Sequence, residues 1–136
     1  MRIAFGTDEA TELTEAVKAA LAEQGHDLVV AAPEGDPWPD VGRAVGEAVA
    51  RGDADRGVVC CWTGTGVSMA ANKVPGARAA LCTDAETARG ARRWNDANVL
   101  AFGLRLTSPE VAREMLDAFL STDPDADEEP NFSRLG

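Results

Sequence analysis

The chain has 136 residues, of which 45% are apolar, 26% are charged and 5% are aromatic. Such a length and composition are typical of one ordinary globular domain, which at this size buries a core without disulfides or a structural metal. The formal net charge of −10 repels nucleic-acid phosphates and anionic membrane surfaces, so we expect neither as a partner.

The three cysteines are Cys60, Cys61 and Cys82, an odd number without the spacing of a zinc site. We therefore expect reduced thiols and no bound metal. The amino-terminal residues turn polar before a signal-like apolar stretch develops, and no run approaches the ~18 apolar residues of a spanning helix. These features predict a cytoplasmic protein.

Short aliphatic runs alternate with stretches of helical periodicity, which predicts a repeated strand–helix pattern. We expect five strands, buried on both faces, at Arg2–Gly6, Asp27–Ala32, Gly57–Cys61, Arg78–Cys82 and Val99–Phe102. Helix boundaries are indicated by Gly25, Pro39, a capping box of Thr83 with Glu86, and Ser108-Pro109. The prediction is a Rossmann-like, doubly wound, five-stranded parallel sheet in a three-layer α/β/α sandwich over residues 1–120. Residues 121–136 are acidic and contain proline, as in a loose tail.

Ligands of such folds bind at the carboxyl ends of the strands. There, the segment Cys61–Gly66 joins a predicted strand to a helix beginning near Val67, so the amides of its glycine-containing turn should converge on an anion. The segment is no Walker loop, and Met69 replaces the third glycine of a dinucleotide fingerprint. A bare Gly-x-Gly turn is as readily a structural turn as a binding site.

Cys61 makes a binding site the better interpretation. A thiol between a strand end and a helix amino terminus is well placed to act as a thiolate, which either takes a proton or attacks carbon. The neighbouring Cys60 points to the opposite face of the sheet, and Cys82 is more simply a buried apolar residue.

Other polar residues give weaker signals. Asp8 and Glu9 follow the first strand, as in a phosphoacceptor domain, but the third strand ends in Cys61 instead of an aspartate. His26, the only histidine, precedes the second strand at the wrong end of the sheet. The predicted fourth helix has three arginines, which are best interpreted as part of its solvent-exposed face: Arg89, Arg92 and Arg93. Arg105 follows the last strand and is a better anion ligand.

Three segments together resemble the ribose-5-phosphate isomerase B family, which includes the galactose-6-phosphate isomerase subunits. The matching segments, in order and spacing, are Ile3–Asp8, Cys61–Lys73 and Asn95–Arg105. The resemblance covers about residues 1–120, and the blocks Ala-Ala-Asn-Lys and Asn-Val-Leu-Ala-Phe-Gly are specific.

The resemblance implies an aldose–ketose isomerase that works through an enediolate, without metal or cofactor, in a homodimer whose sites borrow residues from the partner. By this resemblance Cys61 is the base that moves a proton between carbons 1 and 2. Amides around Thr63, Gly64, Thr65 and Gly66 hold the enediolate oxygen. Asp8 and Asn95 contact sugar hydroxyls, and Arg105 contacts phosphate.

The sequence also departs from the family pattern. Glu9 and Trp94 stand where the family usually has histidines. The family histidine at the position of Trp94 is the one that opens the sugar ring. Trp62 replaces a glycine, Trp38-Pro39 replaces Tyr-Pro, and the acidic tail replaces a basic segment. We expect Trp62 and Trp94 to line a reshaped pocket, for a substrate that is acyclic or short or that lacks a phosphate. Tryptophans packed at a dimer interface would give the same sequence pattern. The alternative is a catalytically silent paralogue that binds a small polyol or sugar acid, or that pairs with an active isomerase subunit.

Overall fold

The computed structural model describes all 136 residues, and its five parallel strands form one sheet in the order β2-β1-β3-β5-β4. The strands are β1 (Arg2–Thr7), β2 (Asp27–Val30), β3 (Arg56–Cys61), β4 (Ala79–Leu81) and β5 (Val99–Gly103). The helices are α1 (Glu12–Glu23), α2 (Trp38–Ala50), α3 (Thr65–Asn72), α4 (Ala85–Asn95), α5 (Pro109–Ser121) and α6 (Glu129–Phe132). The predicted doubly wound parallel sheet is therefore confirmed.

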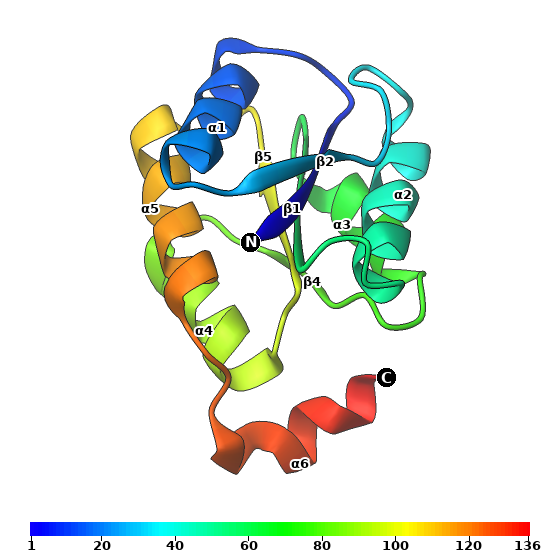
Figure 1. The fold of residues 1–136 in the computed structure, drawn as a ribbon, viewed down its shortest axis with the longest axis vertical. Helices are drawn as coiled ribbons and strands as arrows, with labels where there is room; N and C mark the ends of the chain where they lie inside the picture. Colours follow the sequence, from blue (N-terminus) through cyan, green and yellow to red (C-terminus); the bar gives the residue numbers. More distant parts are fainter.

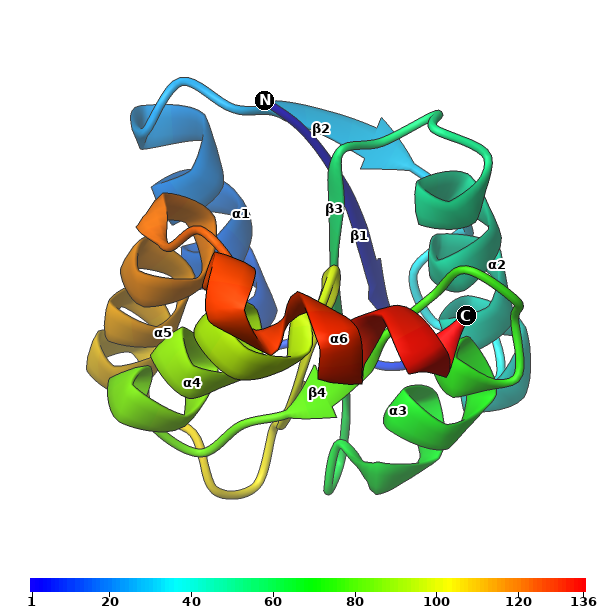
Figure 2. The same ribbon diagram turned by 90° about the horizontal axis from the view of Figure 1, so that it is seen from below.

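Two helical layers enclose the sheet. Helices α1, α4 and α5 cover one face, while α2 and α3 cover the other (Figures 1 and 2). Because successive side chains of a strand point to opposite faces, Cys60 packs in the core under the first layer and Cys61 in the core under the second. The opposite orientation of these two thiols was predicted from the sequence.

The edge strands differ from the prediction. β2 and β4 are shorter than expected, and β2 is mostly exposed and β4 only partly buried, whereas we expected burial on both faces. Each has a hydrogen-bonded neighbour on one side alone, β1 for β2 and β5 for β4. Val30, for example, is among the most exposed apolar side chains of the chain. Aliphatic composition predicts a strand but does not indicate its place in the sheet.

Two helix starts were also placed wrongly. The amino-terminal cap of α4 is Asp84, whose carboxylate accepts from the Thr87 amide at 2.8 Å, so the predicted capping box of Thr83 with Glu86 does not form. Aspartate is a favoured amino-terminal cap, because its side chain accepts this amide hydrogen bond and its negative charge interacts favourably with the helix dipole. Helix α3 begins at Thr65, two residues before Val67.

The carboxyl-terminal segment is helical where we expected a loose tail. After α5 the Asp125 amide donates to the Arg93 carbonyl at 2.8 Å, and α6 lies across the end of the molecule beyond α4 (Figure 2). Arg92, predicted to be solvated, is 1% exposed and binds the Asp96 carboxylate and the carbonyls of Ala97 and Thr122. No helix has the length and apolar character needed to cross a membrane.

Candidate functional site

A cavity of about 300 Å³ opens at the carboxyl ends of β1 and β3. From these neighbouring strands the chain leaves toward opposite faces, to α1 after β1 and to α3 after β3, which is where a doubly wound sheet forms its ligand crevice. The residues that line the cavity are Asp8, Trp38, Cys61, Trp62, Thr63, Thr65, Gly66 and Met69. Six of these were predicted as site residues from the sequence.

Cys61 is the one cysteine that lines this cavity. Its side chain is 5% exposed and packs beside Val67 and other apolar residues under α2 and α3. The other two thiols are buried elsewhere, and burial raises the pKa of Cys60 and of Cys82 to about 12. The Cys60 sulfur faces the Gly6 carbonyl at 4.0 Å, away from the cavity.

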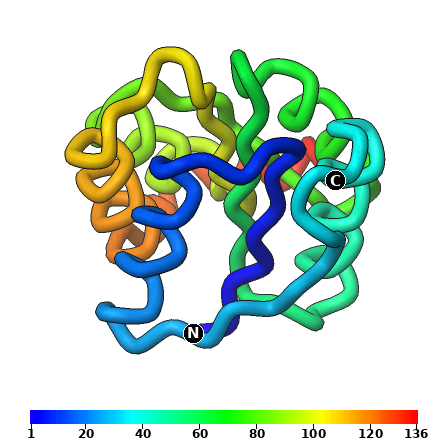
Figure 3. The backbone as a smooth tube through the Cα atoms, turned by 90° about the horizontal axis from the view of Figure 1, so that it is seen from above, coloured from blue at the N-terminus to red at the C-terminus, as the bar shows by residue number.

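The turn after Cys61 is held by its contact with the end of β5. Gly64 has φ of +80°, and a Cβ there would lie 2.6 Å from the Phe102 carbonyl carbon. The Leu104 amide donates to the Cys61 carbonyl at 2.9 Å, and the Arg105 amide donates to the Trp62 carbonyl at 3.0 Å. Figure 3 shows the loop after β5 (yellow) beside the loop after β3 (green). Only glycine fits at position 64 without strain.

Several amides of this turn have no hydrogen-bond partner within the chain. Those of Trp62, Thr63 and Gly64 donate to no other group of the chain. The amides in the first turn of α3 have no acceptor within the helix, because no helical carbonyl precedes them by one turn. The first paired amide is that of Ser68, which donates to the Gly64 carbonyl at 3.2 Å. The hydroxyl oxygens of Thr63 and Thr65 lie 2.9 Å apart beside them. The turn therefore offers neutral hydrogen-bond donors to a developing oxyanion.

Large apolar side chains form the outer walls of the cavity. Trp38 is 43% exposed and lies against Gly66, since a Cβ on Gly66 would be 2.9 Å from the indole. The side chains of Trp62 and Met69 are more exposed than that of Trp38. The predicted site omitted Trp38 and Met69. Met69 could have been found, because it lies one turn after Thr65 on the same face of α3.

Asp8 is the one charged residue that lines the cavity. Partial burial raises the pKa of its carboxyl, and the charge of Glu9 adds to that shift. Glu9 itself does not line the cavity, and its main chain bonds the Thr7 hydroxyl. The Arg105 side chain is exposed in the loop after β5 and forms no ion pair. His26 lies 3.0 Å from the amino-terminal nitrogen, away from the cavity as predicted.

Trp94 and Asn95 do not join this cavity. They line a second one of about 490 Å³ beside the edge strand β4, which β5 separates from β3. The predicted site residues of one chain are therefore divided between two cavities, except for Glu9, Gly64 and Arg105, which line neither of them.

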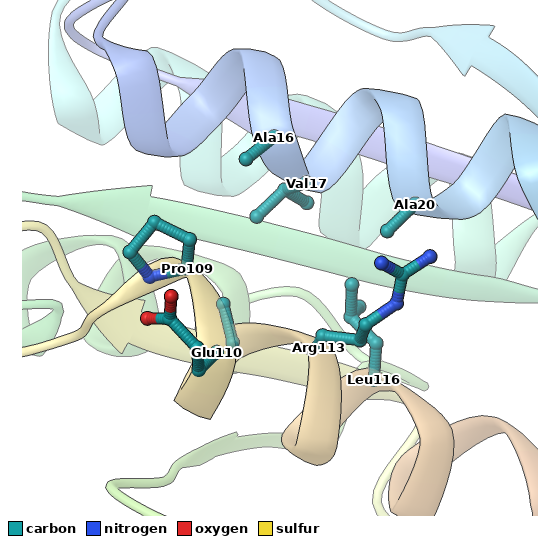
Figure 4. A pocket seen from close by; sticks show the side chains of 8 residues that line it. Ala16, Val17, Ala20, Pro109, Glu110, Arg113 and Leu116 are labelled. Atoms are coloured by element: carbon teal, nitrogen blue, oxygen red, sulfur yellow. The ribbon is translucent and has the colours of Figure 1, made fainter.

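Another hollow lies between α1 and α5 (Figure 4). It measures about 170 Å³ and is lined mainly by alanine, valine and leucine, with Glu110 and Arg113 at its side. It lies on the face of the sheet opposite to Cys61 and contains none of the predicted site residues.

Comparisons with known proteins agree with this fold. The family model for ribose/galactose isomerases matches residues 3–134. A ribose-5-phosphate isomerase B of Escherichia coli is 39% identical over 123 residues, or 88% of this chain and 83% of the relative. A D-erythrulose-4-phosphate isomerase of Pectobacterium atrosepticum is 37% identical over 130 residues, or 90% and 84%. The solved ribose-5-phosphate isomerase B of Clostridium thermocellum superposes with a TM-score of 0.92 at 35% identity, covering 100% of this chain and 95% of the other. The chain belongs to the ribose/galactose isomerase family, whose relatives named here are sugar phosphate isomerases.

Proposed function

We propose that this chain is an aldose–ketose isomerase in which the Cys61 thiolate transfers a proton between carbons 1 and 2 of a sugar or sugar phosphate. The main observation behind the proposal is that Cys61 lines the same cavity as Trp62 and Thr63, whose amides have no partner within the chain. A carbonyl placed between them would have a base on one side and oxyanion donors on the other.

The reaction needs only these groups. The thiolate takes the proton from carbon 2 of the aldose, the C–H electrons form a double bond between carbons 1 and 2, and the carbonyl oxygen becomes an oxyanion. The turn amides stabilise that charge, which is worth about 3 kcal/mol for each well-placed donor. The thiol then returns the proton to carbon 1, while a proton passes from oxygen 2 to oxygen 1, a step that the Thr63–Thr65 hydroxyl pair can assist.

We infer that the substrate is short and open-chain. Opening a sugar ring requires proton transfer at the ring oxygen and at the anomeric hydroxyl, and the cavity contains no histidine for this work. A four-carbon sugar with its phosphate on oxygen 4 cannot close a five-membered ring, so it needs no ring opening. One relative is named D-erythrulose-4-phosphate isomerase, which supports this substrate class.

We further propose that the protein works as a homodimer with its sites between subunits. Trp94 and Asn95 line a cavity separate from that of Cys61, so a second copy is the simplest way to bring them together. Arg105, exposed and without an ion pair, would contact the phosphate in that arrangement. The three free thiols are in keeping with a cytoplasmic location, which we retain as part of the proposal.

The test is an isomerisation assay with four- and five-carbon sugar phosphates and their unphosphorylated forms. The wild-type chain should convert the four-carbon phosphate fastest, and Cys61→Ala should lower that rate about 10²–10⁴-fold. Cys82→Ala is the matched control, because its thiol is buried away from the cavity. Inertness of the wild type on the whole panel would favour a silent paralogue.

A further inference from the structure

The last residue of α3 holds the adjacent edge strand through two hydrogen bonds. The Asn72 side-chain amide donates to the Ala79 carbonyl at 2.9 Å, and its oxygen accepts from the Ala79 amide at 2.8 Å. Both main-chain groups of Ala79 are thereby paired by one side chain on the outer side of β4. The Asn72 amide takes the place of a neighbouring strand there.

Helix α3 depends on such anchors for its position. It has eight residues, which is too short for a helix to persist by itself in water. Sideways it is fixed by contact with α2, because a Cβ on Gly42 would lie 2.6 Å from the Ala70 Cβ and 2.7 Å from the Val67 carbonyl oxygen. That contact between small groups is non-directional. It therefore fixes the distance between the two helices, but it restrains the rotation of α3 about its own axis less well.

The two hydrogen bonds of Asn72 are directional. They tie the carboxyl end of α3 to β4, and β4 is paired with β5. The other end of α3 is preceded by its amino-terminal cap Gly64, which β5 also contacts. Helix α3 is thus attached to the β4–β5 pair at both ends. Its amino-terminal turn contains Thr65 and Gly66, which line the Cys61 cavity and whose amides have no partner within the chain.

We propose that Asn72 is a positioning residue for the isomerisation: by fixing α3 against β4 it keeps the amides of residues 62–67 aimed at the enediolate oxygen. Asn72 itself does not line the cavity of Cys61. The inference rests on the proposed function for its catalytic consequence. Its structural consequence can be measured independently, because oxyanion donors must be held to within a fraction of an ångström to be effective.

The structure also offers a matched control. Asn98 makes the same kind of double contact with the residues just before β4, where its oxygen accepts from the Arg78 amide at 2.7 Å and its amide donates to the Gly76 carbonyl at 2.9 Å. These bonds do not involve α3. Asn98→Ala therefore removes as many hydrogen bonds beside the same strand, without releasing the helix.

The experiment compares Asn72→Ala, Asn72→Asp and Asn98→Ala with the full-length wild type. We measure kcat and KM of isomerisation, the melting temperature, and hydrogen exchange of the α3 amides Ser68–Ala71. Asn72→Ala should lower kcat about tenfold or more with little change in KM, and should speed exchange in α3. Asn72→Asp, which keeps one of the two contacts, should lie between. Asn98→Ala should lower the melting temperature at least as much, with kcat and α3 exchange unchanged.

The proposal is overturned if Asn72→Ala lowers the melting temperature but leaves kcat and α3 exchange as they are in Asn98→Ala. If the wild type isomerises none of the sugars, the proposed function fails, and exchange in α3 alone then decides whether Asn72 holds the helix. Should Asn98→Ala not fold, Asn98→Asp takes its place as the control.

Discussion

The three cysteines show how one residue type takes different roles through position alone. Cys60 and Cys61 are neighbours in β3, yet the alternation of the strand directs them into different cores. This much follows from the sequence, since alternation is a local property of a strand. That Cys61 borders a cavity while Cys82 does not could be inferred only from its place beside the glycine turn.

The buried thiols should make the protein less stable in alkali. Burial raises the pKa of Cys60 and of Cys82 from an ordinary 9.0 to about 12. Between these values the unfolded chain has lost protons that the folded chain keeps, so the free energy of unfolding falls as the pH rises. Urea midpoints measured between about pH 8 and about pH 11 should show this decline. Cys82→Ala should make the slope shallower, and an unaltered slope would contradict the assignment.

Arginine 92 marks where sequence reasoning fails at the residue scale. Arg89, Arg92 and Arg93 look alike in sequence, but only Arg92 is buried. It donates to carbonyls of Ala97 and Thr122, which belong to loops after α4 and α5. Its partners are set by how these loops meet, and no local pattern encodes that.

At the element scale, the central strands were predicted better than the edge strands. β1, β3 and β5 are buried through most of their length, and their aliphatic runs identify them almost to the residue. The predicted ranges of β2 and β4 are too long and their predicted burial is too high, because both depend on the order of strands in the sheet. The same order placed β5 between β3 and β4, which separates Trp94 and Asn95 from Cys61.

The turn before α3 can be tested with a pair of glycines. Gly64 and Gly25 have nearly the same φ, +80° and +81°, but a Cβ on Gly25 would meet nothing within 4 Å whereas one on Gly64 would clash with Phe102. Gly25→Ala should cost about 1 kcal/mol of stability, from the left-handed backbone alone. Gly64→Ala should cost about 2 kcal/mol more in urea unfolding, since main chain must shift. Equal losses would show that the turn does not pack against β5 as described.

At the scale of the whole molecule, the two cavities predict that activity is shared between copies. Cys61→Ala and Asn95→Ala should each be nearly inactive alone. When the two variants are unfolded and refolded together, half of the dimers contain one copy of each and have one intact site, so about a quarter of wild-type activity should return. Separately refolded variants mixed without exchange serve as the control. If no activity is recovered, Cys61 and Asn95 do not act together in a site shared between two chains.

The carbon–hydrogen bond at carbon 2 gives the most direct test of proton transfer by Cys61. The open-chain four-carbon aldose phosphate is incubated with enzyme in deuterium oxide, and the recovered aldose is examined by NMR for deuterium at that carbon. We predict exchange with the wild type and with Cys82→Ala, and none above the uncatalysed rate with Cys61→Ala. Equal exchange with wild type and Cys61→Ala, or none with either, would contradict the account.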